Sequence, residues 1–411
     1  MQMPRIVTSC NRAFTAILAP GLVFGALTIL ASLSTAYAVE DVYLTEVPDY
    51  EWNYGCFGTA TGNLMGFWDR HGMQDFYTGS VGKGVAPLDS FSANAGIVAM
   101  WASSGHINDY YAAYQSTQPD SFVRAQRTEH TPDCIGDFIG LSQKKWKNMN
   151  GECDGNLDAY SFVYWDATAE RRINYTPSSE AGPPVDIQSG LRAWTAYRGY
   201  GADVFTQLTD FNPNKTGPGG FTFDDMKAEL DAGYPVLLFM QAYTEISRPN
   251  FSDGYFGDPI WTNANPEIHG MLAYGYFIDD SGTQYVRYRT SWATGDANLS
   301  VWTSDDWTPE GQLNLPVRGV IGFHPLPKIT SVKTGAGSVT LQWDGPEAQV
   351  FDNVAQTTRI AHWYVVERAD SLSPPNFQAV AQATSDHTLQ ITNCCDGSAF
   401  FRVRLVPTPA Q

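Results

Sequence analysis

The spacing of apolar and polar residues predicts helices in the first half of the chain. Apolar side chains recur every three or four positions from Phe57 to Phe67, and Gly72 provides a stop. The same spacing predicts helices over 93–102 and 187–198. Thr222 is followed by Asp225 at the spacing of a capping box, which predicts a helix that stops at Gly233.

Strand patterns dominate the second half. A continuous apolar run over 235–240 indicates a buried strand, and the runs over 269–277 and 285–292 are joined by a polar turn, as in a β-hairpin. A further strand is expected over 317–323. Because helices come first and strands follow, the pattern favours an α+β fold over alternating α/β units.

The composition changes at Leu326-Pro327. Short alternating runs separated by turn residues then predict a small all-β sandwich over 326–411. The segments Leu-Gln-Trp-Asp (341–344) and Trp-Tyr-Val-Val-Glu-Arg (363–368) give this region a resemblance to a fibronectin type III domain. We expect the sandwich to follow a larger domain over 39–325, and it is a candidate for contact with a cell-surface polymer.

Residues 1–38 have the pattern of a cleavable signal peptide. Two arginines precede a long apolar run, and the segment ends with Ala36-Tyr37-Ala38, which fits the A-x-A cleavage pattern. Pro20 and Gly21 favour cleavage over an uncleaved anchor. The expected location is therefore secreted or periplasmic, with no membrane insertion after cleavage. The net charge of -18 argues against nucleic acid as a partner.

The cysteines divide into expected classes. Cys134 and Cys153 close a short loop and are the expected disulfide in an exported chain. Zinc held by His130, Cys134 and Cys153 is the alternative, which the absence of a tight Cys-x-x-Cys pair disfavours. The adjacent pair 394–395 is either bridged or reduced, and Cys56 is left over as a candidate reactive thiol.

Cys56 begins the first predicted helix, where the helix dipole and free N–H groups favour the thiolate. A buried structural cysteine is the alternative interpretation. A cysteine nucleophile needs a base, and His269 begins a strand whose hairpin partner returns through Thr290. We expect the Thr290 hydroxyl to accept the Nδ1–H of His269 and so fix its tautomer.

These blocks together resemble papain-like cysteine peptidases, and more narrowly the bacterial C39-like group. The resemblance implies a helix that carries the nucleophile Cys56, an antiparallel sheet that carries the base His269, a peptide or protein substrate, and neither cofactor nor metal. It also implies an oxyanion contact from the backbone N–H of Cys56. The residues that carry it are Tyr50-x-Trp52-x-Tyr54-Gly55-Cys56, Thr59-Ala60, Gly66-Phe67-Trp68-Asp69, Asp133-Cys134-Ile135-x-Asp137-Phe138-Ile139-Gly140, Leu230–Val236, His269-x-Met271, Gly275-Tyr276 and Ser291-Trp292.

Two positions depart from the family pattern. Thr290 stands where the family has an asparagine or aspartate, and Tyr50 stands where it has a glutamine that contacts the oxyanion. Asn53 and the Trp52 indole are the nearby candidates for that contact. The departures keep two alternatives open: a catalytically inactive module that binds peptide or surface polymer, and a relative that transfers the acyl group to an amine.

Overall fold

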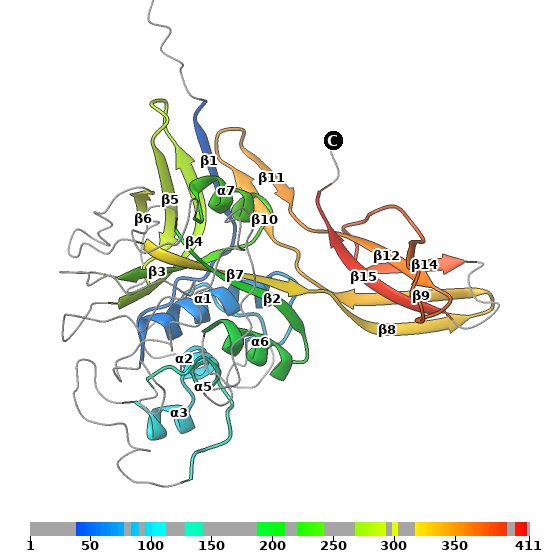
Figure 1. Cartoon of the computed structure of the whole chain (residues 1–411), viewed down its shortest axis with the longest axis horizontal. Coiled ribbons are helices and arrows are strands. Elements are labelled where there is room, and N and C mark those ends of the chain that lie inside the picture. The colour runs from blue at the N-terminus through cyan, green and yellow to red at the C-terminus, as the bar shows by residue number, and fades with distance from the viewer. Residues whose placement is uncertain are drawn as a thin grey trace, which may run out of the picture. The chain divides into compact units, whose positions relative to one another are not determined.

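The computed structural model describes residues 38–77, 84–89, 95–111, 128–142, 187–209, 220–241, 268–292, 298–302, 317–392 and 399–408. The expected signal peptide up to residue 37, Cys153 and the pair 394–395 lie outside these residues. The fold is mixed α+β and its sheets are antiparallel, which confirms the fold class predicted from the order of elements (Figure 1). Within the described residues, no helix combines the length and apolar character needed to cross a bilayer.

The helices of the described part of the chain all lie between residues 56 and 231. They are α1 (Cys56–Arg70), α2 (Ala95–Trp101), α3 (Ser104–Asp109), α5 (Ile135–Ile139), α6 (Ile187–Tyr197) and α7 (Phe223–Asp231). The pattern predicted α1, α2, α6 and α7, including the capping box in which Thr222 and Asp225 exchange hydrogen bonds. It missed α3 and α5, which are a turn or two long and too short to show a period.

Helix α1 is the central helix of the main core, because every residue from Cys56 to Asp69 is buried. Its glycines allow close packing: a methyl group at Gly58 or Gly62 would lie 2.7 or 2.4 Å from the ring of Trp101. A helix that is buried on all sides is held by tertiary packing rather than by one apolar stripe.

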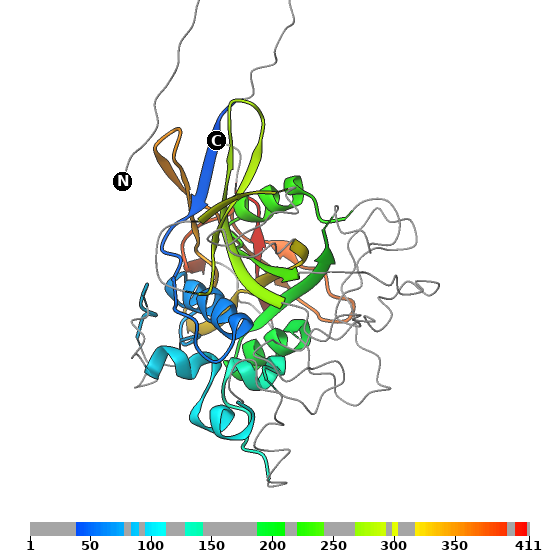
Figure 2. The same cartoon turned by 90° about the vertical axis from the view of Figure 1, so that its left-hand side faces the viewer.

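The main sheet contains β1 (Glu40–Leu44), β2 (Gly201–Leu208), β3 (Val236–Gln241), β4 (Ile268–Ile278), β5 (Gln284–Arg289), β6 (Asn298–Val301), β7 (Val317–Leu326), β10 (Gln349–Asp352) and β11 (Thr357–Ile360). Strand β4 is its centre. One edge of β4 pairs with β5, and the other is shared by β3 at residues 268–273 and β1 at residues 275–278. Helices α1 and α7 both pack on β4 (Figure 2). Phe57 of α1 lies against Gly270, and Phe223 of α7 lies against Tyr276.

The C-terminal region forms a second, smaller core between two three-stranded sheets. One sheet orders its strands β14 (Thr388–Thr392), β9 (Ser338–Asp344) and β8 (Lys328–Gly335), and the other orders β13 (Gln378–Ala379), β12 (Trp363–Ala369) and β15 (Phe400–Val406). Trp343 from the first sheet and Tyr364 from the second are both buried in the core that they share.

The β10–β11 hairpin does not belong to this sandwich, although it lies between two of its strands in sequence. Residues Val42 to Leu44 of β1 pair with Asp352 to Val350 of β10, so the hairpin extends the main sheet. Asn353 also donates a hydrogen bond to the carboxylate of Asp41. Residues 349–360 are therefore an exception to the expected division of the chain at residue 326.

Candidate active site

The chain enters α1 through a tightly fixed turn. Tyr54 has a positive φ of 55° and Gly55 a φ of 144°, a conformation that only glycine adopts easily. The first helical hydrogen bond runs from the Thr59 N–H to the Gly55 carbonyl, and the Thr59 hydroxyl donates to the same oxygen. The N–H groups of residues 56–58 therefore precede the first hydrogen bond of the helix. Cys56 itself is buried, with 7% of its surface exposed.

His269 is held at the start of β4 by the chain that follows β5. Its Nε2 lies 2.5 Å from the main-chain carbonyl oxygen of Thr290, and a carbonyl can only accept, so Nε2 carries the proton. The Trp292 ring stacks on the imidazole at 4.5 Å between centroids and 15° between planes. Nδ1 then carries the lone pair, and it is buried without a hydrogen-bond partner among the described residues.

Burial determines the charge of this imidazole. It lowers the pKa of His269 to about 4, although the hydrogen bond to Thr290 acts in the opposite direction. The ring is therefore neutral at neutral pH, and its Nδ1 can accept a proton.

The prediction for Thr290 named the right residue and the wrong atoms. The hydroxyl was expected to accept the Nδ1–H of His269, but the main-chain carbonyl accepts the Nε2–H. The hydroxyl instead accepts a hydrogen bond from the N–H of Trp292 at 3.2 Å. Ser291, with a φ of 60°, makes the turn after β5 at this point. Orientation of His269 therefore does not depend on the side chain at position 290.

Two contacts join the Cys56 segment to the His269 segment. Phe57, the residue after Cys56, packs on Gly270, the residue after His269, so closely that a methyl group there would lie 2.7 Å from the Phe57 ring. The Trp52 N–H donates to the carbonyl of Trp292 at 3.1 Å. The start of α1 and the start of β4, far apart in sequence, are thus adjacent in the fold.

Tyr50, at the position of the family's glutamine, and the oxyanion candidates Asn53 and Trp52 make the following contacts. The Tyr50 hydroxyl donates to the Pro87 carbonyl at 2.8 Å, and its ring lies against Gly66, several turns along α1 from Cys56. The Asn53 side-chain amide points to the Glu51 carbonyl at 3.5 Å. Trp52 contributes its main-chain N–H to the contact with Trp292. Asn53 and the Trp52 indole stay predictions for the oxyanion contact.

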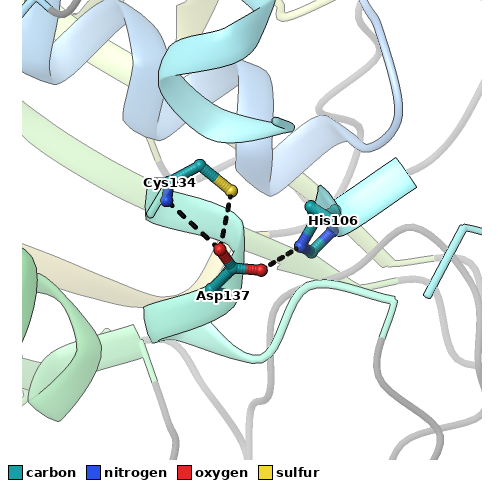
Figure 3. Close-up of side chains that lie close together, drawn as sticks. All are labelled: His106, Cys134 and Asp137. Atoms are coloured by element: carbon teal, nitrogen blue, oxygen red, sulfur yellow. Dashed lines mark hydrogen bonds and ion pairs between the residues drawn. The ribbon is translucent and has the colours of Figure 1, made fainter. Parts of the chain in front are cut away.

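A second polar cluster surrounds Asp137 and includes Cys134. Cys134 is a free, buried cysteine at the start of α5, and its Sγ donates to Asp137 Oδ2 at 3.3 Å. The Cys134–Cys153 disulfide stays a prediction, because Cys153 lies outside the described residues. His106 Nδ1 contacts the other oxygen of Asp137 at 2.8 Å (Figure 3). Burial and the neighbouring Asp137 raise the pKa of the Cys134 thiol well above its usual range.

The chain matches no family model, no curated protein and no solved structure. Function must therefore be inferred from the residues and their geometry.

Several residues of these two sites escaped the sequence analysis. Trp292 was quoted only as part of a motif, and nothing in the sequence assigned its ring to His269. His106, Asp109 and the carboxylate of Asp137 were not singled out as chemistry. The spacing Cys134-x-x-Asp137 is a capping box with cysteine in place of serine, and that pattern could have located α5.

Proposed function

We propose that this protein is a thiol hydrolase of the papain-like cysteine peptidase type, which cleaves peptide or amide bonds through an acyl-enzyme on Cys56. The observation that carries the proposal is the state of His269. Its Nε2–H is held by a main-chain carbonyl, its bare Nδ1 is buried, and the next residue, Gly270, packs on Phe57, which follows Cys56. A base needs this arrangement to receive a thiol proton.

The reaction would proceed in two halves. In the first, Sγ of Cys56 forms a bond to the substrate carbonyl carbon while its proton moves to Nδ1 of His269, and the carbonyl oxygen takes the negative charge. The C–N bond then breaks, and the amine leaves with the proton from Nδ1. In the second half, water loses a proton to Nδ1 and attacks the thioester. The carboxylic acid leaves, and the thiol recovers its proton.

Two features of the fold would assist these steps. The Thr290 carbonyl lies at Nε2, where it stabilises the imidazolium that forms transiently. Backbone N–H groups in the first turn of α1 point to the N-terminal end of the helix, where Cys56 lies. They would donate hydrogen bonds to the oxyanion that forms there. Removing one such donor typically costs about 100- to 1000-fold in rate.

Selective alkylation tests the proposal, with Cys134 as a matched control. Both cysteines are buried and stand at the start of a helix, but the thiol of Cys134 donates to a carboxylate. At pH 7.5 iodoacetamide should label Cys56 and leave Cys134 unlabelled, as read by peptide mapping of the folded protein.

Variants complete the test. Cys56→Ala should abolish hydrolysis of an unstructured protein substrate, and His269→Ala should lower it about 1000-fold. Cys134→Ser should retain the labelling of Cys56. Slow, unselective labelling of Cys56 in the wild-type protein would contradict the proposal.

Burial of the two reacting groups favours one alternative, a catalytically inactive binding module. Only 2% of the surface of His269 and 7% of Cys56 are exposed. This alternative predicts peptide binding that Cys56→Ala leaves unchanged, and no hydrolysis in the wild-type protein. The expected secretion remains a proposal, which N-terminal sequencing of the protein from its host would test by locating the new terminus at Val39.

A further inference from the structure

The Asp137 cluster has the donor set of a metal site. One ligand atom each from His106, Cys134 and Asp137 lies within 4.8 Å of the other two, and all three residues are buried. They come from different elements: His106 from α3, Cys134 from the N-cap of α5, and Asp137 from within α5. Nitrogen, sulfur and oxygen together are the ligands of zinc and similar transition metals in proteins.

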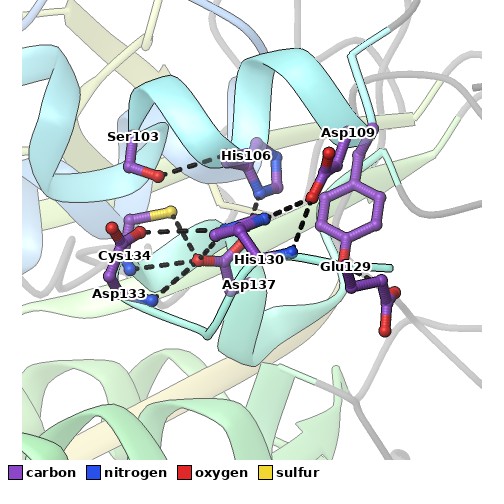
Figure 4. A network of polar contacts seen from close by, with 9 residues as sticks. Ser103, His106, Asp109, Glu129, His130, Asp133, Cys134 and Asp137 are labelled. Atoms are coloured by element: carbon purple, nitrogen blue, oxygen red, sulfur yellow. Dashed lines mark hydrogen bonds and ion pairs between the residues drawn. The ribbon is translucent and has the colours of Figure 1, made fainter. Parts of the chain in front are cut away.

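His130 lies beside this set with the support that a metal-binding imidazole has. Its Nδ1 contacts Asp109 Oδ2 at 2.6 Å, and its Nε2 lies 3.1 Å from Asp137 Oδ2 (Figure 4). A histidine ligand almost always donates its second nitrogen to a carboxylate or carbonyl, which fixes the ring and its tautomer. Asp109 is 1% exposed and would serve His130 in this way.

His106 faces the cluster with one nitrogen only. Its Nδ1 contacts Asp137 Oδ1, and its Nε2, on the other side of the ring, has no hydrogen-bond partner in the part of the chain that the structure describes. Nδ1 would therefore be the ligand atom of this fully buried ring, and Nε2 would carry the ring proton.

One oxygen of Asp137 has more hydrogen-bond donors around it than it can accept. Asp137 Oδ2 alone is contacted by His130 Nε2, by the N–H groups of Asp133 and Cys134, and by the Cys134 thiol. A carboxylate oxygen has two lone pairs for these four contacts. A cation would replace the two side-chain protons among them and leave the two backbone contacts in place.

We propose that His106, Cys134, Asp137 and His130 bind one zinc-type divalent ion, with Asp109 as the positioning residue for His130. On binding, metal–sulfur and metal–nitrogen bonds form. The thiol proton of Cys134 and the proton on Nε2 of His130 pass to solvent, and the ring proton of His106 moves from Nδ1 to Nε2, so that Nδ1 can bind the ion. The Cys134 thiolate and the Asp137 carboxylate then offset the ion's charge. The ion is a structural one, and the proposal does not rest on the hydrolase activity.

Such an ion would stabilise the packing of α1 through residues that lie between the cluster and this helix. It would tie α3 to α5, and the backbone of Gly136 in α5 packs against the Trp101 carbonyl. The Trp101 ring lies on Gly58 and Gly62 of α1, and its indole N–H donates to Asn53 in the turn before Cys56. Loss of the ion should therefore lower the melting temperature of the whole main domain.

Metal analysis of the intact chain tests the proposal. Protein purified without chelator and loaded with zinc should retain about one ion per chain after gel filtration. Cobalt(II) in its place should give intense tetrahedral d–d bands and a thiolate charge-transfer band. Cys134→Ser should lose the charge-transfer band, and the matched variant Cys56→Ser should keep it.

A milder variant tests the proposal without removing a buried ligand, so that misfolding does not obscure the result. Asp109→Asn keeps every proposed ligand and should weaken zinc binding about 10- to 100-fold, measured by competition with a chromogenic chelator. If folded wild-type protein binds no zinc or cobalt and neither ion raises its melting temperature, the cluster is only a hydrogen-bonded helix cap. A peptide map that links Cys134 to Cys153 would overturn the proposal equally. Neither result would bear on the reactivity of Cys56.

Discussion

At the scale of single residues, the orientation of His269 depends on a main-chain carbonyl oxygen, which every amino acid has. The Thr290 main-chain carbonyl accepts its Nε2–H, while the threonine hydroxyl accepts a backbone N–H from Trp292. Thr290→Val should therefore lose one neutral hydrogen bond, worth about 1 kcal/mol, and lower kcat/KM less than 10-fold. A loss as large as that of His269→Ala would show that the hydroxyl itself orients the base.

The Trp292 ring covers one face of the His269 imidazole. Burial lowers the pKa of His269 to about 4, so hydrolysis should remain near its maximum down to about pH 5. Trp292→Ala exposes the ring, and the pKa should rise toward about 6.5, the value for a solvated histidine. The acid limb of the kcat/KM profile should then move to higher pH by one to two units, because the base must be neutral. Trp302→Ala, which removes another buried indole, should leave that limb in place.

At the scale of elements, the contact between α1 and β4 aligns the two halves of the site. Gly270→Ala would place a methyl group 2.7 Å from the buried Phe57 ring, which has no room to withdraw. Overpacking of this kind costs about 1–3 kcal/mol, and here it would separate Cys56 from His269. Alkylation of Cys56 should slow at least 10-fold. Phe57→Leu in the same chain should restore part of the rate, and if it restores none, the contact does not align the site.

Sequence patterns located the elements whose signal is local. The thirteen residues from Cys56 to Trp68 follow helical spacing, and Thr222 with Asp225 set the start of α7 as predicted. Strand β2 and the β10–β11 hairpin were missed, because their partners β7 and β1 are distant in sequence and no local pattern encodes such pairing. The roles of the Thr290 carbonyl and the Trp292 ring were hidden for the same reason. They arise from the turn at Ser291, which a sequence does not display.

At the scale of the whole molecule, three buried histidines make the free energy of unfolding depend on pH. Burial lowers the pKa of His71 and His269 to about 4 and that of His362 to about 3, whereas an unfolded histidine titrates near 6.5. Below about pH 6.5 these three histidines therefore bind more protons in the unfolded chain than in the folded one. Their contribution to the free energy of unfolding should be level above that pH and should fall as pH falls. Each histidine contributes about 2 kcal/mol between pH 7.5 and pH 5.

Urea unfolding at the two pH values measures this loss. His362→Gln should remove about a third of the difference, since His362 is neutral in the fold and accepts the Ala348 N–H through Nδ1. An unfolding free energy that is unchanged between pH 7.5 and pH 5 would show that these rings are protonated at little cost in the folded state.

The pairing of β10 with β1 also sets an order of events for a newly made chain. Val42 is synthesised 310 residues before Asp352, its neighbour in the sheet. Until Asp352 has been made, one edge of β1 has no partner strand. The sheet on which α1 packs is then incomplete. If the thiol is the nucleophile we infer, the enzyme would mature only after the β10–β11 hairpin has been synthesised.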